Sequence, residues 1–167
     1  MKSRIRAFRG EDTDTVNRIV VAAYERYRNE FANWAQTAAY FAESANLANE
    51  LEQLIAEGIE SEVLGAVGYV APNRPRDSMF EPGWAVIRRL AVDPVFQGRG
   101  VGRLLTEECI ARARHDGARV IALHTSPILE VAFSMYARLG FSHHRDTADV
   151  QGVLYGVYTL ASAGYFP

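Results

Sequence analysis

The chain has 167 residues, of which 49% are hydrophobic and 23% charged, and its formal net charge is −2. This composition is ordinary for a folded domain, and the length is enough to close one hydrophobic core without metals or disulfides. The small negative charge gives no general attraction to nucleic acid or to an anionic membrane. The single cysteine cannot form an internal disulfide, and no apolar run approaches the length of a membrane span. We therefore expect one cytoplasmic domain over residues 1–167, with neither a membrane nor a nucleic acid as its partner.

Apolar residues recur with the spacing of helices and strands along the whole chain. In chain order, the predicted elements are a strand at 4–8, a helix capped at 12 or 13 and running to about 29, a helix at 35–50, strands at 53–57 and 62–70 that form an antiparallel hairpin, a strand at 84–92, a helix at 100–115, a strand at 120–124, a helix that starts at Ser126-Pro127 and ends at Gly140, and strands at 141–145 and 153–160. A polar, proline-bracketed loop at 72–83 is the best candidate for a mobile segment or a lid.

Aromatic residues continue the apolar stripe of the first predicted helix. The stripe consists of Val20, Tyr24, Tyr27, Phe31 and Trp34. Alternating steps of four and three residues are the ordinary mark of a buried helix face, so we predict that the stripe packs in the core. An aromatic wall that faces a ligand is the alternative.

The segment 97–102, QGRGVG, lies between an apolar strand and an amphipathic helix. Glycines let a backbone approach a ligand closely, and a helix start presents unpaired N–H groups with partial positive charge, so the segment predicts a phosphate or pyrophosphate site. A nucleotide-binding P-loop would need Lys and then Ser or Thr after the last glycine, where this chain has Arg103 and Leu104. A dinucleotide-binding motif starting at Gly98 would need a glycine at 103 and a later acidic residue, and both are missing.

The loop does match Gln/Arg-x-x-Gly-x-Gly/Ala through Gln97, Gly100 and Gly102, and here it resembles the acyl-coenzyme A site of the GNAT N-acetyltransferase superfamily. A second segment, AFSMYARLGF at 132–141, is similar to the family's Ala-x-x-x-Tyr-x-x-x-Gly-Phe segment. The resemblance is close over residues 86–145. It implies an α/β (α+β) fold, in which a mixed central sheet of about six to seven strands with splayed central strands is flanked by about four helices.

The resemblance also implies acetyl-coenzyme A as the cofactor that donates the acyl group. The residues expected to bind it are Leu90, Ala91, Val92, Gln97, Gly98, Arg99, Gly100, Val101, Gly102 and Arg103. The strand residues would pair with the pantetheine arm and offer donors to the acyl carbonyl, and the loop amides would hold the pyrophosphate. No metal is expected, since His143-His144 lacks the cysteine or carboxylate spacing of a metal site.

Tyr136 is the general acid that the resemblance implies, because it lies at the edge of a buried helical stripe from which its hydroxyl can reach a cleft. Two departures leave the general base open: residues 84–90 contain no acid, and the position seven residues before the tyrosine, where many members have Asn, is Leu129. An ammonium acceptor must lose a proton before it attacks. His124 and Glu81 are the two candidates for that base.

The predicted function is therefore an N-acetyltransferase of the EC 2.3.1 type. It would transfer an acetyl group from acetyl-coenzyme A to a primary amine of an unidentified small molecule or peptide, by direct attack in a ternary complex. The alternative is an acyl-coenzyme A-binding sensor or regulatory module with little or no turnover, because catalysis needs a proton acceptor. A homodimer would be compatible with the resemblance.

Overall fold

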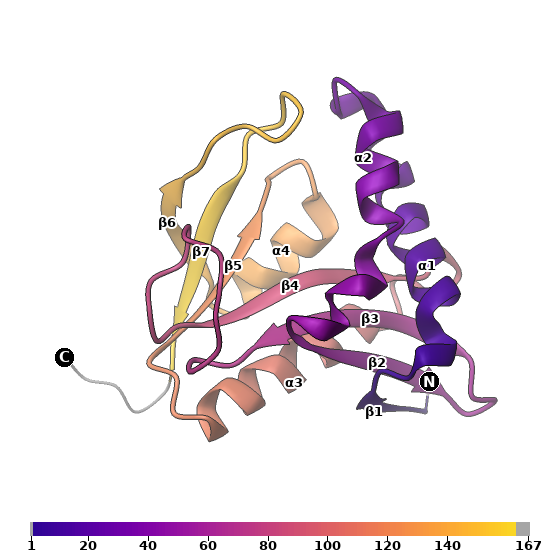
Figure 1. Ribbon diagram of the computed structural model, residues 1–167, viewed down its shortest axis with the longest axis horizontal. Helices are drawn as coiled ribbons and strands as arrows, with labels where there is room; N and C mark the ends of the chain where they lie inside the picture. Colours follow the sequence, from indigo (N-terminus) through magenta and orange to yellow (C-terminus); the bar gives the residue numbers. More distant parts are fainter. Residues whose placement is uncertain (1, 163–167) are drawn as a thin grey trace.

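The computed structural model of the chain describes residues 2–162, which fold around a sheet with the strand order β1-β2-β3-β4-β5-β7-β6 (Figure 1). The strands are β1 (Ser3–Ala7), β2 (Glu52–Gly58), β3 (Val63–Val70), β4 (Ala85–Val92), β5 (Val120–Thr125), β6 (Ser142–Asp146) and β7 (Gly156–Ala161). The pairing of β4 with β5 is parallel, and the other neighbouring pairs are antiparallel. This confirms the predicted mixed sheet and the predicted hairpin.

Helices cover both faces of the sheet: α1 (Thr13–Glu25) and α2 (Trp34–Phe41) lie on one face, and α3 (Val101–His115) and α4 (Glu130–Arg138) lie on the other (Figure 1). The alternation of strand residues explains this arrangement. On β2, Leu54 packs in the same cluster as Leu105 of α3, whereas the next residue, Ile55, packs with Ile19 of α1. No helix within residues 2–162 has both the length and the apolar character that a membrane crossing requires.

Three predicted helix boundaries are wrong. The first helix ends at Glu25 rather than near 29, and the second ends at Phe41, after which 3-10 turns cover Ser44–Asn49. The last helix begins at Glu130 and not at Ser126-Pro127. Ser126 instead closes a turn, because its carbonyl accepts from the Leu129 N–H at 3.0 Å and its hydroxyl accepts from the Ile128 N–H at 3.4 Å. The Ser126 hydroxyl therefore caps a turn that precedes the helix and not the helix itself.

A bulge in β4 changes the direction of the strand in the middle of the sheet. The register with β3 shifts between Ala66 and Gly68, and Arg89 adopts φ 52°, a left-handed conformation that bends a strand. Pairing with β5 is limited to Ala85–Ile87, after which the two strands diverge (Figure 1). The predicted splayed central strands are thus confirmed, and the β5-facing backbone edge of β4 is left without a partner strand beyond Ile87.

Candidate active site

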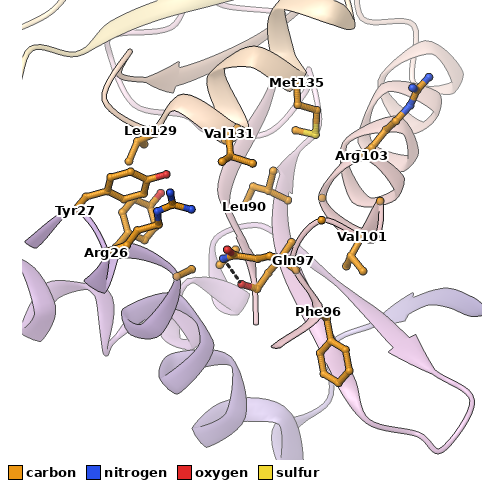
Figure 2. A pocket seen from close by; sticks show the side chains of 18 of the residues that line it. Arg26, Tyr27, Leu90, Phe96, Gln97, Val101, Arg103, Leu129, Val131 and Met135 are labelled. Carbon is orange, nitrogen blue, oxygen red and sulfur yellow. Dashed lines mark hydrogen bonds between the residues drawn. The ribbon is translucent and has the colours of Figure 1, made fainter. Parts of the chain in front are cut away.

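A cavity of about 350 Å³ opens beside the second half of β4 (Figure 2). Its walls are the end of α1 with the residues just after it, β4 beyond the bulge, the glycine loop, the start of α3, and α4. The lining includes nine of the ten residues predicted to bind the donor, namely Leu90, Ala91, Val92, Gln97, Gly98, Gly100, Val101, Gly102 and Arg103. The tenth, Arg99, places its guanidinium over the ring of Phe96, 5.8 Å from the centroid, and does not line the cavity.

The glycine loop has the geometry of an anion site. Gly98 and Gly100 have φ values of 76° and 84°, which L side chains rarely adopt, and a Cβ atom at either position would meet no atom within 4 Å. Gly100 is the N-cap of α3, and its carbonyl accepts the first helical bond from the Leu104 N–H at 3.0 Å. The N–H groups that precede Leu104 in the helix therefore have no intrahelical acceptor. They offer donors and the positive end of the helix dipole to the same open space.

The loop is attached firmly to the end of β4. The Gln97 side chain donates from Nε2 to the carbonyl oxygen of Val92 at 3.2 Å (Figure 2). A Cβ at Gly102 would lie 3.5 Å from Val92 Cγ2 and 3.8 Å from Met135 Sδ, so the first turn of α3 runs close to both β4 and α4. Gln97 thus holds the loop on the end of β4, and the absence of a side chain at Gly102 lets the first turn of α3 pack closely on β4.

Three arginines line the cavity, and two of them pair with a glutamate. Arg26 approaches Glu130 Oε1 at 3.4 Å, and Arg103 is hydrogen-bonded to Glu107 at 2.8 Å. Arg138 has no ion-pair partner within the described part of the chain. Arg26 and Arg138 were not predicted as site residues, because each reaches the cavity from a helix end that only the tertiary fold brings next to the glycine loop.

Tyr136 is held at the end of α4 by a glycine cap. Gly140 has φ 97°, and the Phe141 N–H donates to the carbonyl of Tyr136 at 3.0 Å, which is the bond pattern of a Schellman motif. The rings of Tyr136 and Phe141 meet edge to face with centroids 5.7 Å apart. The Tyr-x-x-x-Gly-Phe segment therefore has a physical basis, since the cap fixes the tyrosine that precedes it by four residues.

The Tyr136 side chain is buried, and its hydroxyl has no hydrogen-bond partner within residues 2–162. Burial raises the pKa of Tyr136 above its ordinary value of 10.0. The hydroxyl consequently keeps its proton at physiological pH, as a proton donor requires. Tyr136 does not line the cavity itself, although Met135 and Leu139 of the same segment do.

His124 lies where β4 and β5 separate. Ala122 of β5 pairs with Val86 of β4, so His124 and Arg88 occupy the next positions on that same face of the two strands. This is the face that carries α1 and α2, because Ala122 packs with Val86 in a cluster apart from the residues under α3. His124 does not line the 350 Å³ cavity but stands beside the gap from which the cavity opens.

The hydrogen bonds of His124 indicate which ring nitrogen is free. Nε2 lies 2.8 Å from Thr147 Oγ1, and that hydroxyl also lies 3.1 Å from the carbonyl oxygen of Tyr155. With the proton on Nε2, the ring donates to the hydroxyl and the hydroxyl donates to the carbonyl, so this tautomer satisfies both contacts. Nδ1 then carries the free lone pair. Burial lowers the pKa of His124 below its ordinary value of 6.5, which keeps the ring neutral at physiological pH.

Glu81, the other base candidate, lies in the loop before β4 with an exposed side chain. Its carbonyl oxygen accepts from the Trp84 N–H at 3.3 Å, and the residue does not line the cavity. Within residues 2–162, no group of three or more His, Cys, Asp or Glu is placed to hold a metal ion.

Two aromatic residues of the predicted stripe have a double role that the spacing of the stripe did not reveal. Tyr24 and Tyr27 line the cavity, and they also pack with Phe31 in an apolar cluster. Leu129, at the position where the resemblance led us to look for Asn, belongs to both the cavity wall and this cluster. Tyr24 and Tyr27 therefore contribute both to the apolar core and to the wall of the cavity.

Comparison with known proteins gives one family. A sequence model described as the acetyltransferase (GNAT) family matches residues 17–141. A GNAT family acetyltransferase from Brucella melitensis, solved in complex with acetyl-coenzyme A, is 25% identical with a TM-score of 0.66, over 99% of this chain and 92% of that chain. A GCN5-related N-acetyltransferase from Rhodopseudomonas palustris has a TM-score of 0.74 at 21% identity, over 96% of each chain. An uncharacterized N-acetyltransferase from Methanocaldococcus jannaschii is 39% identical over 57 residues, which are 34% of this chain and only 25% of that relative.

Proposed function

The chain belongs to the acetyltransferase (GNAT) family, and from this premise we propose that it transfers an acetyl group from acetyl-coenzyme A to a primary amine, by direct attack in a ternary complex. The observation that carries the proposal is the single cavity that joins an anion-binding loop to an unpaired strand edge. Such a cavity fits a donor that has a pyrophosphate at one end and an amide-rich arm at the other. The Brucella melitensis neighbour, which binds acetyl-coenzyme A, supports this choice of donor.

The donor end is assigned to residues whose geometry matches each part of it. The free N–H groups at the start of α3 would hold the pyrophosphate, with Arg103 and Arg138 adding positive charge. Leu90 and Val92 would offer their backbone to the amide-rich arm along the edge that β5 leaves open. When bound, acetyl-coenzyme A supplies a thioester carbonyl that an amine can attack.

Proton transfer is assigned to His124, where β4 and β5 separate, and to Tyr136 in α4. His124 Nδ1 accepts a proton from the amine nitrogen, because its lone pair is free and its ring is neutral. Tyr136 Oη donates its proton to the leaving sulfur, because burial keeps it protonated. A nitrogen–carbon bond forms as the carbon–sulfur bond breaks, so one proton is taken up and one is released by the protein in each turnover.

Release of free thiol tests the proposal. The protein is incubated with acetyl-coenzyme A and a panel of primary amines while the thiol is measured, and donor binding is measured separately by calorimetry. Thiol release that depends on an amine supports the transferase. Binding of the donor without thiol release for any amine would contradict it and favour a sensor or regulatory module, and absence of binding would refute both.

A further inference from the structure

A second cavity, of about 570 Å³, lies on the face of the sheet that carries α2. Its floor is apolar: Val70 of β3 and Val86 of β4 pack there with Leu51 and Phe80. Arg88 lines this cavity, and Leu90 of the same strand lines the first one. The two cavities therefore follow one another along β4, on either side of the bulge at Arg89.

Charged side chains of both signs line the second cavity without pairing with one another. They are Glu50, Arg74, Arg76, Asp77 and Arg88, and none of them forms an ion pair within the described residues. Arg76 is already engaged, because its guanidinium donates to the backbone carbonyls of Trp84, Pro72 and Arg74 and so holds the loop at the edge of the cavity.

Arg88 differs from Arg76 in that its guanidinium has no hydrogen-bond partner among the side chains that the structure describes, which are those of residues 2–48 and 50–162. It is partly buried and lies at the parting of β4 and β5, one strand away from His124. A partly buried guanidinium without acceptors has the geometry to bind a carboxylate, because its planar set of donors matches two carboxylate oxygens.

We propose that the second cavity binds the acceptor, and that the acceptor is an amine that carries a carboxylate, with an amino acid of apolar side chain as the simplest case. This inference rests on the proposed acetyl transfer. Arg88 binds the carboxylate, and the floor at Val70, Val86 and Phe80 packs against the side chain. The amine and the carboxylate of an amino acid are joined through one carbon, so an amine next to Arg88 lies beside His124 and the gap.

Matched acceptors test the carboxylate requirement. Thiol release from acetyl-coenzyme A is measured with L-phenylalanine, L-phenylalaninamide and 2-phenylethylamine, which share one apolar group and differ in the carboxylate. We expect kcat/KM for L-phenylalanine to exceed that of both other amines at least tenfold, as for a charged hydrogen bond. Equal or higher values for the two amines without a carboxylate overturn this inference but leave the transferase intact, whereas no thiol with any amine overturns the transferase itself.

Variants then locate the carboxylate. Arg88→Gln should raise KM for L-phenylalanine at least tenfold and leave KM for L-phenylalaninamide within about twofold, and Arg88→Lys should restore part of the loss. Arg114→Gln is the control, because Arg114 is exposed in the last turn of α3 and lines neither cavity. Unchanged KM for L-phenylalanine in a folded Arg88→Gln protein overturns the assignment.

Discussion

Tyr136 carries the sharpest prediction at the scale of a residue. Tyr136→Phe keeps the ring against Phe141 and removes only the hydroxyl, which has no partner within residues 2–162. We expect kcat to fall at least tenfold, the usual contribution of a general acid, while the Kd of acetyl-coenzyme A changes little. Steady-state kinetics and calorimetry measure the two quantities. Tyr158→Phe, on β7 and outside the cavity, is the matched control, and an unaltered kcat in Tyr136→Phe would remove the role.

His124 predicts how the rate depends on pH. Because burial lowers its pKa, the neutral base persists below pH 6.5, and kcat should fall only as the pH drops through that lowered pKa. A pH profile of kcat measures this acid limb. In His124→Gln the limb should disappear together with most of the rate, whereas His115→Gln, at the exposed end of α3, should leave the profile unchanged. If the fall in kcat at low pH is still present in His124→Gln, the group that titrates is not His124.

Residues in the two motifs could be predicted from the sequence, and the base could not. The glycine pattern alone predicted a phosphate site, and the family resemblance added the strand residues and the acyl donor. The choice between His124 and Glu81 depends on Thr147, which is 23 residues away from His124, and on a hydrogen bond that fixes the ring nitrogen. Neither sequence pattern nor composition contains that contact.

At the scale of an element, the glycine loop distinguishes two glycines that look alike in the sequence. Gly100→Ala forces a side chain into φ 84°, which costs about 1–2 kcal/mol, and the backbone will relax and move the donors at the start of α3. Gly102 lies inside the helix, where its added Cβ would make only ordinary contacts at 3.5 Å or more, and alanine there gains about 1 kcal/mol of helix propensity.

We therefore expect Gly100→Ala to lower the unfolding temperature and to weaken acetyl-coenzyme A binding at least tenfold, since a charged hydrogen bond contributes about 1.5–3 kcal/mol. Gly102→Ala should bind the donor nearly as well as the wild type and be at least as stable. Thermal unfolding and calorimetry of the two variants side by side provide the comparison. An equal loss of donor binding in both variants would show that the volume of the added methyl group, and not the backbone conformation, determines how well the loop binds the donor.

At the scale of the whole molecule, an ion cluster joins the first strand to α1 and the sheet. Arg6 of β1 contacts Asp12 at 2.7 Å and Glu57 of β2 at 2.6 Å, and all three side chains are largely buried. The hydrogen bond from Arg6 lowers the pKa of Asp12 below its ordinary value of 3.8. Asp12 therefore stabilises the fold fully above that ordinary value, and its contribution is lost as the pH falls through the lowered pKa.

Asp12→Asn should then lower the free energy of unfolding by about 2 kcal/mol at pH 7, because Arg6 loses part of its charged partner. The difference in the free energy of unfolding between this variant and the wild type should become smaller as the pH falls below 3.8. Denaturant unfolding at several pH values measures it. Glu11→Gln, at an exposed neighbour of Asp12, is the control, and a difference that does not change with pH would show that Asp12 acts through packing alone.

The fold was predicted best where the local pattern of apolar residues and turn residues is clear. Strands β2 to β5 and helix α3 lie within a few residues of their predicted places, because apolar runs and glycine ends mark them. The end of α1 was predicted poorly. The helical spacing of aromatic residues continues beyond Glu25, although the helix ends there and the chain turns. Likewise, the bulge at Arg89 falls on a residue type that carries no signal for positive φ.

Within the described residues, the seven-stranded sheet has two parts, β1 to β4 and β5 with β7 and β6, and three residue pairs of β4 and β5 join them. A donor lying along the open edge of β4 would become a neighbour to both halves. Binding of the donor would then increase the free energy of unfolding of the protein. The midpoint of thermal unfolding should therefore rise with the logarithm of the donor concentration. In a cell, the supply of the acyl donor would thus set how long the protein persists as well as how fast it works.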